Sequence, residues 1–366
     1  TTGLEVVPEG GEYVRKAVRL ERNMGLHLRV IADFEAGDED LLPAATYLAG
    51  QEVFIREREG YYFPVSNVEV VGLVDRIPLA EKEGIYVRRL DSGVITTVLG
   101  PVSYLPDPSR EEVLRRYVGA DDIELYDLHD HNPERALAVY VPPSTAVLVT
   151  AKNKREVSIG PKTQILDHDD ELERLTLSTG RPKSDDNLLT TCFLQIEGNK
   201  VSDLVNVKTA DHVELQVALS YRVSFVSDSE KWFAVKDYVG LLCDHAGSII
   251  RAAARSAPIE RFHAESTEIL RSAILGPRNA EGRREGRHFA ENNMWVYDVE
   301  VLAVHIEDED VEELLTTAQR SAIVSDIARK EEQLRLGDEQ LKESVNQQIY
   351  ESQIATFAVA EQLEAA

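Results

Sequence analysis

The chain is poor in sulfur and has no long apolar run: its 366 residues include two cysteines and two methionines. Cys192 and Cys243 lie far apart in apolar surroundings, which predicts buried free thiols and a reducing, cytoplasmic compartment. No apolar run approaches the ~20 residues of a membrane-spanning helix. The first residues carry no signal-peptide or lipidation pattern. We therefore expect neither a secreted disulfide scaffold nor a protein with a membrane span.

Basic residues are scarce, with 40 Lys and Arg against 65 Asp and Glu, so the formal net charge is −25. Such a surface repels nucleic acid and anionic lipid, and direct nucleic-acid binding is not expected. The hydrophobic fraction of 43% and charged fraction of 29% are typical of globular proteins. The length allows about two to four domains.

Catalytic motifs are also missing. The sequence holds no G-x-S-x-G, no H-E-x-x-H and no cysteine in a plausible His–Asn setting. Acids are so abundant that a pair of carboxylates carries no information about glycosidase-type catalysis. We therefore expect no catalytic residue, no cofactor and no enzymatic activity.

Two acidic stretches contain residue types that bind Zn or Mn: Asp127, His129, Asp130 and His131 in one, and residues 168–170 in the other. Neighbours on one loop rarely complete a metal site without a distant ligand, so solvated acidic loops are the favoured interpretation and no metal is assigned.

A Gly- and Arg-rich stretch over residues 276–287 has the composition of a phosphate-binding loop. It lacks the G-x-x-x-x-G-K-[ST] pattern and does not lead into a clear helix, so a connecting loop is favoured.

The clearest secondary-structure signal lies in residues 213–225, where large apolar side chains occupy every second position. A period of two predicts a strand with one buried face. That face is expected to pack on helices around Trp232 and Ile250. The polar face, which includes Ser220, is expected to meet water or another chain.

Before this strand, a β pattern recurs over residues 25–71, 84–114 and 145–175, with a period of roughly 60 residues. Each copy has short strands joined by polar turns, and a Gly-Pro corner recurs at residues 100–101 and 160–161. Such small units must stack on neighbours to bury enough surface; an ordinary β-sandwich is the alternative. The polar stretch 117–133 is predicted to be an inserted surface loop.

After the repeats, residues 191–196 and 201–207 are strand candidates, and helical spacing runs through residues 232–253 and 259–274. Residues 295–304 alternate again as a returning strand. This order predicts an α+β domain. From residue 308 the chain has no proline and a narrow apolar stripe, which predicts one long polar helix that needs partner helices.

Several segments resemble the major vault protein family: IPLAEKEGIYVRRLDSGVI at 77–95, IGPKTQIL at 159–166, LTLSTGRPK at 175–183 and KTADHVELQVALSYRVSF at 208–225. The resemblance implies tandem antiparallel β repeats, an α+β shoulder similar to the SPFH (stomatin-like, band 7) fold, and a long cap helix. It also implies a structural, non-enzymatic protein that self-assembles into the hollow cage of a ribonucleoprotein particle. The family has further repeats ahead of these, so a truncated chain and a shorter, prokaryotic-type relative both fit.

The expected organisation has five parts: β repeats over residues 1–75, 76–138 and 139–186, a shoulder domain over 187–306, and the helix over 307–366. The seam between neighbouring helices is expected to be formed by six residues of this helix: Leu314, Leu315, Ala318, Leu334, Leu341 and Val345. Glu214 and Arg222 are weaker candidates for contacts between neighbouring shoulders.

The expected partner is the chain itself, in a many-fold ring that can enclose cargo. A membrane-microdomain scaffold of the SPFH kind is the alternative function. A monomeric adaptor whose acidic helix binds a basic partner is a third.

Overall fold

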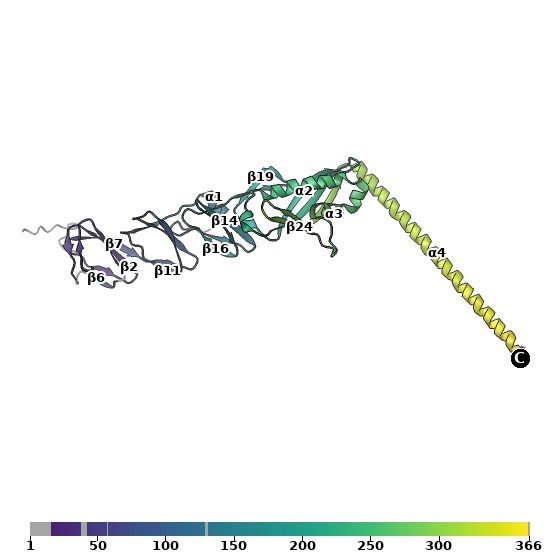
Figure 1. The fold of residues 1–366 in the computed structure, drawn as a ribbon, viewed down its shortest axis with the longest axis horizontal. Helices are drawn as coiled ribbons and strands as arrows, with labels where there is room; N and C mark the ends of the chain where they lie inside the picture. Colours follow the sequence, from purple (N-terminus) through teal and green to yellow (C-terminus); the bar gives the residue numbers. More distant parts are fainter. Residues whose placement is uncertain (1–15, 38–41, 57, 129–130, 365–366) are drawn as a thin grey trace, which may run out of the picture. The chain divides into compact units, whose positions relative to one another are not determined.

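The structure is a computed structural model that describes residues 16–37, 42–56, 58–128 and 131–364. Along the chain come small antiparallel sheets, then a mixed region of strands and helices, then one long helix (Figure 1). The chain divides into two compact units. The first comprises the chain up to Val201 with Tyr221–Asp244 and Arg283–Asp298, and the second comprises Ser202–Ser220, His245–Gly282 and the chain from Val299 onward. The fold class predicted from the sequence is confirmed.

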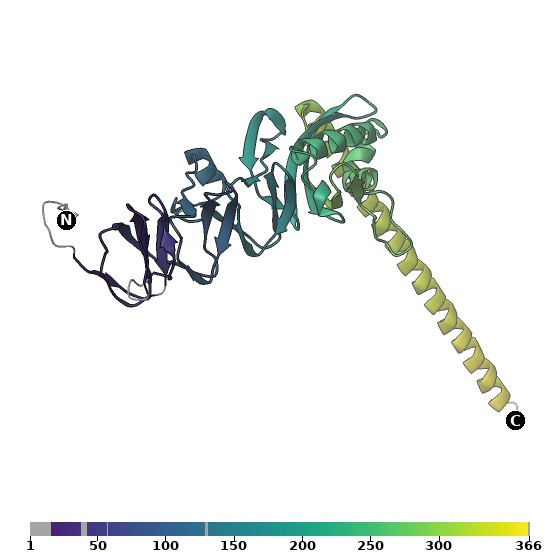
Figure 2. The same cartoon turned by 60° about the vertical axis from the view of Figure 1, so that its left-hand side comes forward.

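Three β repeats share one topology within the first unit (Figure 2). In each, the first long strand lies between two others at the centre of the main sheet, and a short strand before it pairs with a short strand after its hairpin. The first repeat contains β1 (Val18–Leu20), β2 (Met24–Val30), β3 (Phe34–Glu35), β4 (Thr46–Tyr47), β5 (Glu52–Arg56), β6 (Gly60–Tyr62) and β7 (Val68–Asp75). Its main sheet has the order β5-β2-β7, while β1 pairs with β6 and β3 with β4.

The second and third repeats repeat this order. The second contains β8 (Ile77–Leu79), β9 (Gly84–Arg89), β10 (Ile95–Leu99), β11 (Val102–Tyr104) and β12 (Glu111–Leu114), with the sheets β10-β9-β12 and β8-β11. The third contains β13 (Ala138–Val141), β14 (Thr145–Ala151), β15 (Lys154–Ile159), β16 (Lys162–Ile165) and β17 (Glu171–Leu172), with the sheets β15-β14-β17 and β13-β16. A hairpin of β18 (Leu175–Thr179) and β19 (Ser184–Thr191) follows, and β20 (Leu194–Gln195) pairs with β14.

The recurring Gly-Pro corners have a steric cause. A Cβ on Gly100 would collide with the backbone carbonyl oxygen of Ala80, and one on Gly160 would collide with that of Pro142. Glycine is therefore required where the hairpin strand turns back toward the first short strand of its repeat.

Each repeat has a small core of its own. The second repeat buries Leu79, Ile85 and Val87, while the first and third bury larger clusters centred on Leu26 and Val147. A core of this size stabilises little by itself, which explains why the repeats make additional contacts at their junctions.

The stretch 117–133 is not simply a surface loop, and that prediction is corrected. It contains α1 (Ala120–Leu125), and Tyr126 is buried in the core of the third repeat, where its hydroxyl accepts a hydrogen bond from the Leu172 amide at 3.3 Å. The apolar residues Leu125, Tyr126 and Leu128 within this polar stretch supply the burial that the composition alone concealed.

The shoulder region is built on a four-stranded sheet in the order β21-β22-β24-β23. Its strands are β21 (Asn199–Lys208), β22 (Glu214–Phe225), β23 (Arg287–Phe289) and β24 (Met294–Ile306). The alternating stretch predicted as a strand is β22, and its apolar side chains from Leu215 to Val223 are fully buried. Ser220 is buried as well, so its expected exposure on the polar face is wrong: a hydroxymethyl group is small enough for larger neighbours to cover it.

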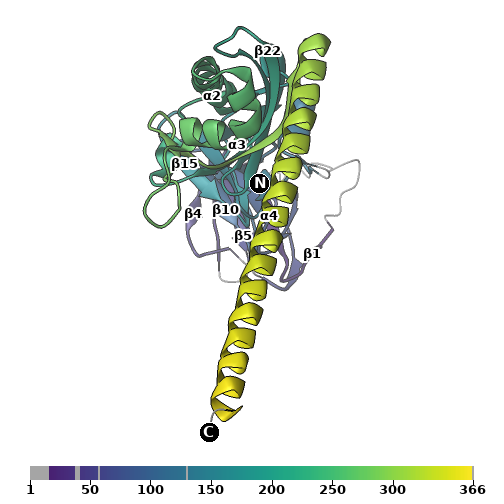
Figure 3. The ribbon, with the colours of Figure 1, turned by 90° about the vertical axis from the view of Figure 1, so that its right-hand side faces the viewer.

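Two helices lie against this sheet, α2 (Tyr238–Arg255) and α3 (Ile259–Leu275) (Figure 3). The helical pattern predicted from residue 232 begins later, at Tyr238, because the 3-10 turn η1 (Ser229–Lys231) comes first. Phe225 at the end of β22 packs on Trp232 and Tyr238, with ring centroids 6.4 and 5.2 Å away. The predicted packing of β22 on the segment around Trp232 is therefore confirmed.

The last element is α4 (Glu309–Glu364), a single unbroken helix of 56 residues (Figure 3). Asp308 caps it, since its carboxylate accepts the amides of Asp310 and Val311 at 3.0 and 3.2 Å. No helix in the described part of the chain is both long and apolar enough to cross a membrane.

Candidate assembly surfaces

Most of α4 is exposed and carries a series of large apolar side chains. From Thr316 to Thr356 every side chain is exposed, including Leu334 (71%) and Leu341 (68%). Among the described side chains of α4, partial burial is confined to the first turns, at Val311 and Leu315, and the Gln319 amide lies 3.3 Å from the His263 ring nitrogen of α3.

The six predicted seam residues occupy two sides of α4. With about 100° between successive residues, Leu334, Leu341 and Val345 fall within about 40° of one another. Leu314 and Ala318 fall about 140–180° away from that group. Leu315 lies between the two sides and is the member partly buried beside its own unit.

Three isoleucines outside the six predicted seam residues extend the first side. Ile323, Ile327 and Ile349 share a face about 80° wide with Leu334, Leu341 and Val345, and the three isoleucines are 49–58% exposed. Ile323, Leu334 and Val345 are spaced by eleven residues, a period that favours nearly straight helices or a right-handed supercoil. We refer to these six side chains together as the apolar stripe: Ile323, Ile327, Leu334, Leu341, Val345 and Ile349.

The two shoulder candidates have different surroundings. Glu214 forms an ion pair with Lys208 across the β21–β22 hairpin at 2.5 Å, and this neighbour lowers the pKa of the Glu214 carboxyl. Arg222 is partly buried on β22. Glu214 therefore already has a partner within its own chain, and its role between chains stays a prediction.

Polar contacts join successive repeats within the first unit, and each junction contains an aspartate. Arg56 on β5 donates to the buried carboxylate of Asp107 at 2.9 Å, and Thr97 on β10 donates to Asp167 at 2.7 Å. In both cases the second strand of one hairpin reaches the loop that follows the Gly-Pro corner of the next repeat. The bond from Thr97, supported by Lys154, lowers the pKa of Asp167.

A third junction joins the β18–β19 hairpin to the start of α2. The Ser178 amide donates to the Asp237 carboxylate at 3.0 Å, and the Ser178 hydroxyl donates to the other carboxylate oxygen. The same carboxylate accepts the Gly240 amide at 2.9 Å at the beginning of α2. Asp237 therefore fixes the hairpin and the helix start at once.

The junction between the second and third repeats is the most elaborate. The fully buried Tyr86 hydroxyl accepts from the Leu137 amide at 2.8 Å and donates to the Leu166 carbonyl at 2.9 Å. Arg116 donates to the carbonyls of Asp167 and Asp170 at 2.7 and 2.6 Å.

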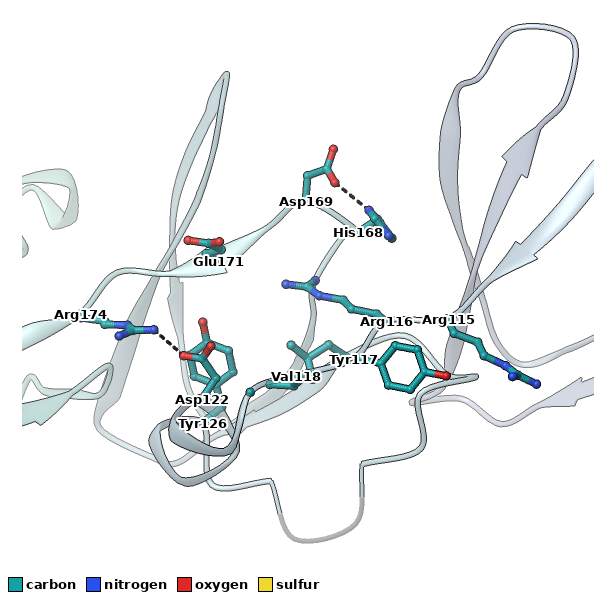
Figure 4. Close-up of a pocket in the computed structure, with 12 residues that line it drawn as sticks. Arg115, Arg116, Tyr117, Val118, Asp122, Tyr126, His168, Asp169, Glu171 and Arg174 are labelled. Atoms are coloured by element: carbon teal, nitrogen blue, oxygen red, sulfur yellow. Dashed lines mark hydrogen bonds and ion pairs between the residues drawn. The ribbon is translucent and has the colours of Figure 1, made fainter.

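A pocket of about 620 Å³ opens beside this junction (Figure 4). Its charged side chains are mostly paired with one another: Arg174 with Asp122 at 2.6 Å, and His168 with Asp169 at 2.7 Å. Arg115 at the rim pairs with Glu134 at 2.6 Å. The lining is thus of mixed charge and does not select one kind of ligand.

The two acidic stretches considered for metal binding have structural contacts instead. His168 packs edge-on against Tyr86 at 5.3 Å, and the buried Asp170 pairs with Lys154 at 2.7 Å. In the other stretch the His131 ring nitrogen lies 2.9 Å from the Arg116 carbonyl oxygen; His129 and Asp130 lie outside the described residues. Among the residues described, no three His, Cys, Asp or Glu side chains are placed to share a metal ion.

The Gly- and Arg-rich stretch is a connection between α3 and β23, as favoured from the sequence. Arg278 is held by Glu268 of α3 at 2.8 Å.

Comparison with known proteins identifies the architecture. The family model for the shoulder domain of the major vault protein (MVP shoulder) matches residues 197–308. The chain is 31% identical to a major vault protein of Diplobatis ommata over 346 residues, which are 86% of this chain and 40% of the relative. The chain is a homologue of the major vault protein.

Similarity to vault proteins extends over nearly the whole chain. The human major vault protein is 29% identical over 402 residues, covering 97% of this chain and 44% of the relative. Major vault protein beta of Dictyostelium discoideum is 29% identical over 317 residues, covering 82% of this chain and 37% of the relative. The chain spans about two fifths of the length of these vault proteins.

The vault resemblance rests on sequence segments, whereas none of the junction residues is predicted from the sequence. Asp107 and Asp167 are sixty residues apart, the same as the repeat period, so an alignment of the repeats on their Gly-Pro corners would have paired them. Tyr86 and Arg116 have no such signal, because their partners are backbone carbonyl and amide groups.

Proposed function

We propose that this chain is a structural self-assembly protein whose copies pack side by side into a ring or barrel-shaped hollow cage of the vault kind. Its partner is a second copy of the chain, and an enclosed cargo stays a prediction. The family to which the chain is homologous supports a structural, non-enzymatic role.

The observation that carries this proposal is the exposed apolar stripe on α4. A helix of 56 residues is about 84 Å long at 1.5 Å per residue, far beyond the reach of its own small domain. Leu334 and Leu341 are about 70% exposed, so their apolar surface is covered when another helix lies alongside. Neighbouring copies would supply that helix, and closure into a ring would also cover the open edges of the repeat sheets.

The proposal is tested by measuring molar mass with light scattering over micromolar concentrations and by imaging the particles in negative stain. Large closed particles are expected. The chain remaining a monomer throughout that range would refute the proposed function.

The helix contact has a matched pair of variants. Leu334→Asp with Leu341→Asp places two carboxylates on the apolar stripe and should abolish large particles, because unpaired charges resist burial. Leu336→Asp puts the same group about 200° from Leu334 on the same stretch of helix and should leave assembly intact. Assembly that survives the double substitution would remove the stripe from the interface.

An SPFH-type membrane scaffold is a second candidate, favoured by the order of an α+β domain followed by a long helix. Co-sedimentation with liposomes of mixed zwitterionic and anionic lipid distinguishes the two functions. Binding to liposomes without formation of closed particles would favour the scaffold.

A further inference from the structure

A small polar pocket in the second unit contains two arginines that have no partner among the described residues. The pocket encloses about 250 Å³ between β21, β22 and the second half of α2. Arg251 and Arg255 project from α2 into its lining, together with Lys208, Glu214 and Glu307. Because Lys208 and Glu214 are paired with each other, two arginines and one further acid, Glu307, remain, and the site keeps an excess of positive charge.

Neither guanidinium has an ion pair or hydrogen bond to the described part of the chain, and both side chains belong to exposed residues. Arg251 and Arg255 are four residues apart, so they stand on the same face of α2, about 6 Å apart at their Cβ atoms. Guanidinium groups bind carboxylates through two parallel hydrogen bonds. In a chain with a net charge of −25, such a free pair fits an acidic partner.

A segment of matching spacing lies at the start of α4. Glu309 and Glu313 are also four residues apart, and Glu312 lies on the same face. Their side chains form no ion pair within the residues described. Acids are favoured at this helix end by the helix dipole, but that effect leaves their carboxylate oxygens available for other contacts.

The acidic turn also begins close to the arginine pocket in the second unit. Glu307 lines the arginine pocket, and the acidic turn begins two residues later. In a ring, copies are related by rotation about one axis, so surfaces at equal level meet across the contact. Four acids in the first turns of each α4 would otherwise repel those of the next copy.

We propose that Arg251 and Arg255 of one copy bind the acidic turn Glu309–Glu313 of the next copy. This inference rests on the proposed self-assembly and names one of its lateral contacts. The contact is electrostatic and separate from the apolar stripe, so it is expected to set neighbour orientation and to weaken with salt.

The test is a charge swap in the full chain, read as the protein concentration at which half of the chain is assembled. Arg251→Glu with Arg255→Glu should raise that concentration roughly tenfold or more at low salt. Lys82→Glu with Lys152→Glu, in exposed turns of the repeats, makes the same change in net charge and should have a much smaller effect.

Adding Glu309→Lys and Glu313→Lys to the arginine variant reverses both sides of the contact and should restore most of the assembly. Peptide-level hydrogen exchange over α2 and α4 checks that each variant keeps its helices. Suppose that the wild-type chain assembles. The contact is then refuted, while self-assembly stands, if the arginine variant assembles equally well or if the four-residue swap assembles no better than the arginine variant. A wild-type chain that never assembles would overturn both.

Discussion

Replacing Tyr86 with phenylalanine isolates the contribution of one hydroxyl to the junction between the second and third repeats. The ring is fully buried and keeps its shape in phenylalanine, so packing is preserved. The substitution removes the hydrogen bonds of the hydroxyl: one from the Leu137 amide at 2.8 Å, one to the Leu166 carbonyl at 2.9 Å, and a longer one from the Arg116 guanidinium at 3.5 Å. Both of these leucines are themselves fully buried, so water cannot replace the hydroxyl without a rearrangement.

The magnitude follows from the cost of leaving buried polar groups unpaired. Each unsatisfied backbone group costs roughly 1–3 kcal/mol, so leaving the Leu137 amide and the Leu166 carbonyl unpaired should destabilise the junction by roughly 2–6 kcal/mol. Since each 1.4 kcal/mol corresponds to about a factor of ten, opening of the junction should become roughly 30- to 20,000-fold more frequent.

Hydrogen–deuterium exchange measured by mass spectrometry is the suitable assay, because a chain of several domains has no single free energy of unfolding. The peptide that contains Leu137 should lose protection, while peptides of the shoulder sheet should keep theirs. Tyr140→Phe is the matched control. Tyr140 lies on β13 of the third repeat and is 57% exposed, so this substitution should change stability by less than about 0.5 kcal/mol. Equal protection of the Leu137 peptide in the wild type and in Tyr86→Phe would refute the argument.

Two further predictions concern ionisable groups. The pKa of Asp167 is lowered by Thr97 and Lys154, so the folded chain favours the charged carboxylate. The contribution of Asp167 to the stability of the fold should therefore be present above the ordinary aspartate pKa and be lost as the pH falls through the lowered value. Urea unfolding followed near residue 167 should therefore become less pH-dependent between about pH 5 and 3 in Asp167→Asn, and an unchanged slope would contradict this. Burial raises the pKa of Cys192 to about 12, so its thiol should resist iodoacetamide at pH 8 in the folded chain and react only after unfolding. Rapid labelling of Cys192 in the native chain would show that it is not buried.

The junctions change how the repeats are understood. A repeat such as the second, with a core of Leu79, Ile85 and Val87, buries little apolar surface. Polar bonds such as the buried one from Tyr86 to Leu166 and the partly buried one from Arg56 to Asp107 add directional constraints that apolar packing lacks. Successive repeats are therefore expected to hold one orientation, which a regular wall of many copies requires.

Much of the fold could be predicted because its signals are periodic. Alternation over residues 213–225 predicted β22, helical spacing over residues 259–274 predicted α3, and the absence of proline after residue 308 predicted α4. Patterns of period two and 3.6 follow from backbone geometry and can be read without knowing the neighbours. The burial of Tyr126 and Ser220 could not be read in this way, because it depends on what other segments cover them.

The order of the architecture, the repeat period and the family could be predicted from the amino-acid sequence, since these depend on local patterns and on segments that resemble known ones. Which polar residues join the repeats became evident from the folded chain, since Tyr86 and Arg116 bind backbone groups that are distant in sequence. The fold also pairs Glu214 with Lys208, leaves Arg251 and Arg255 without a partner among the described residues, and divides the predicted seam between two sides of an unbroken α4. Contacts of this kind arise from side chains brought together across the fold, and no local period encodes them.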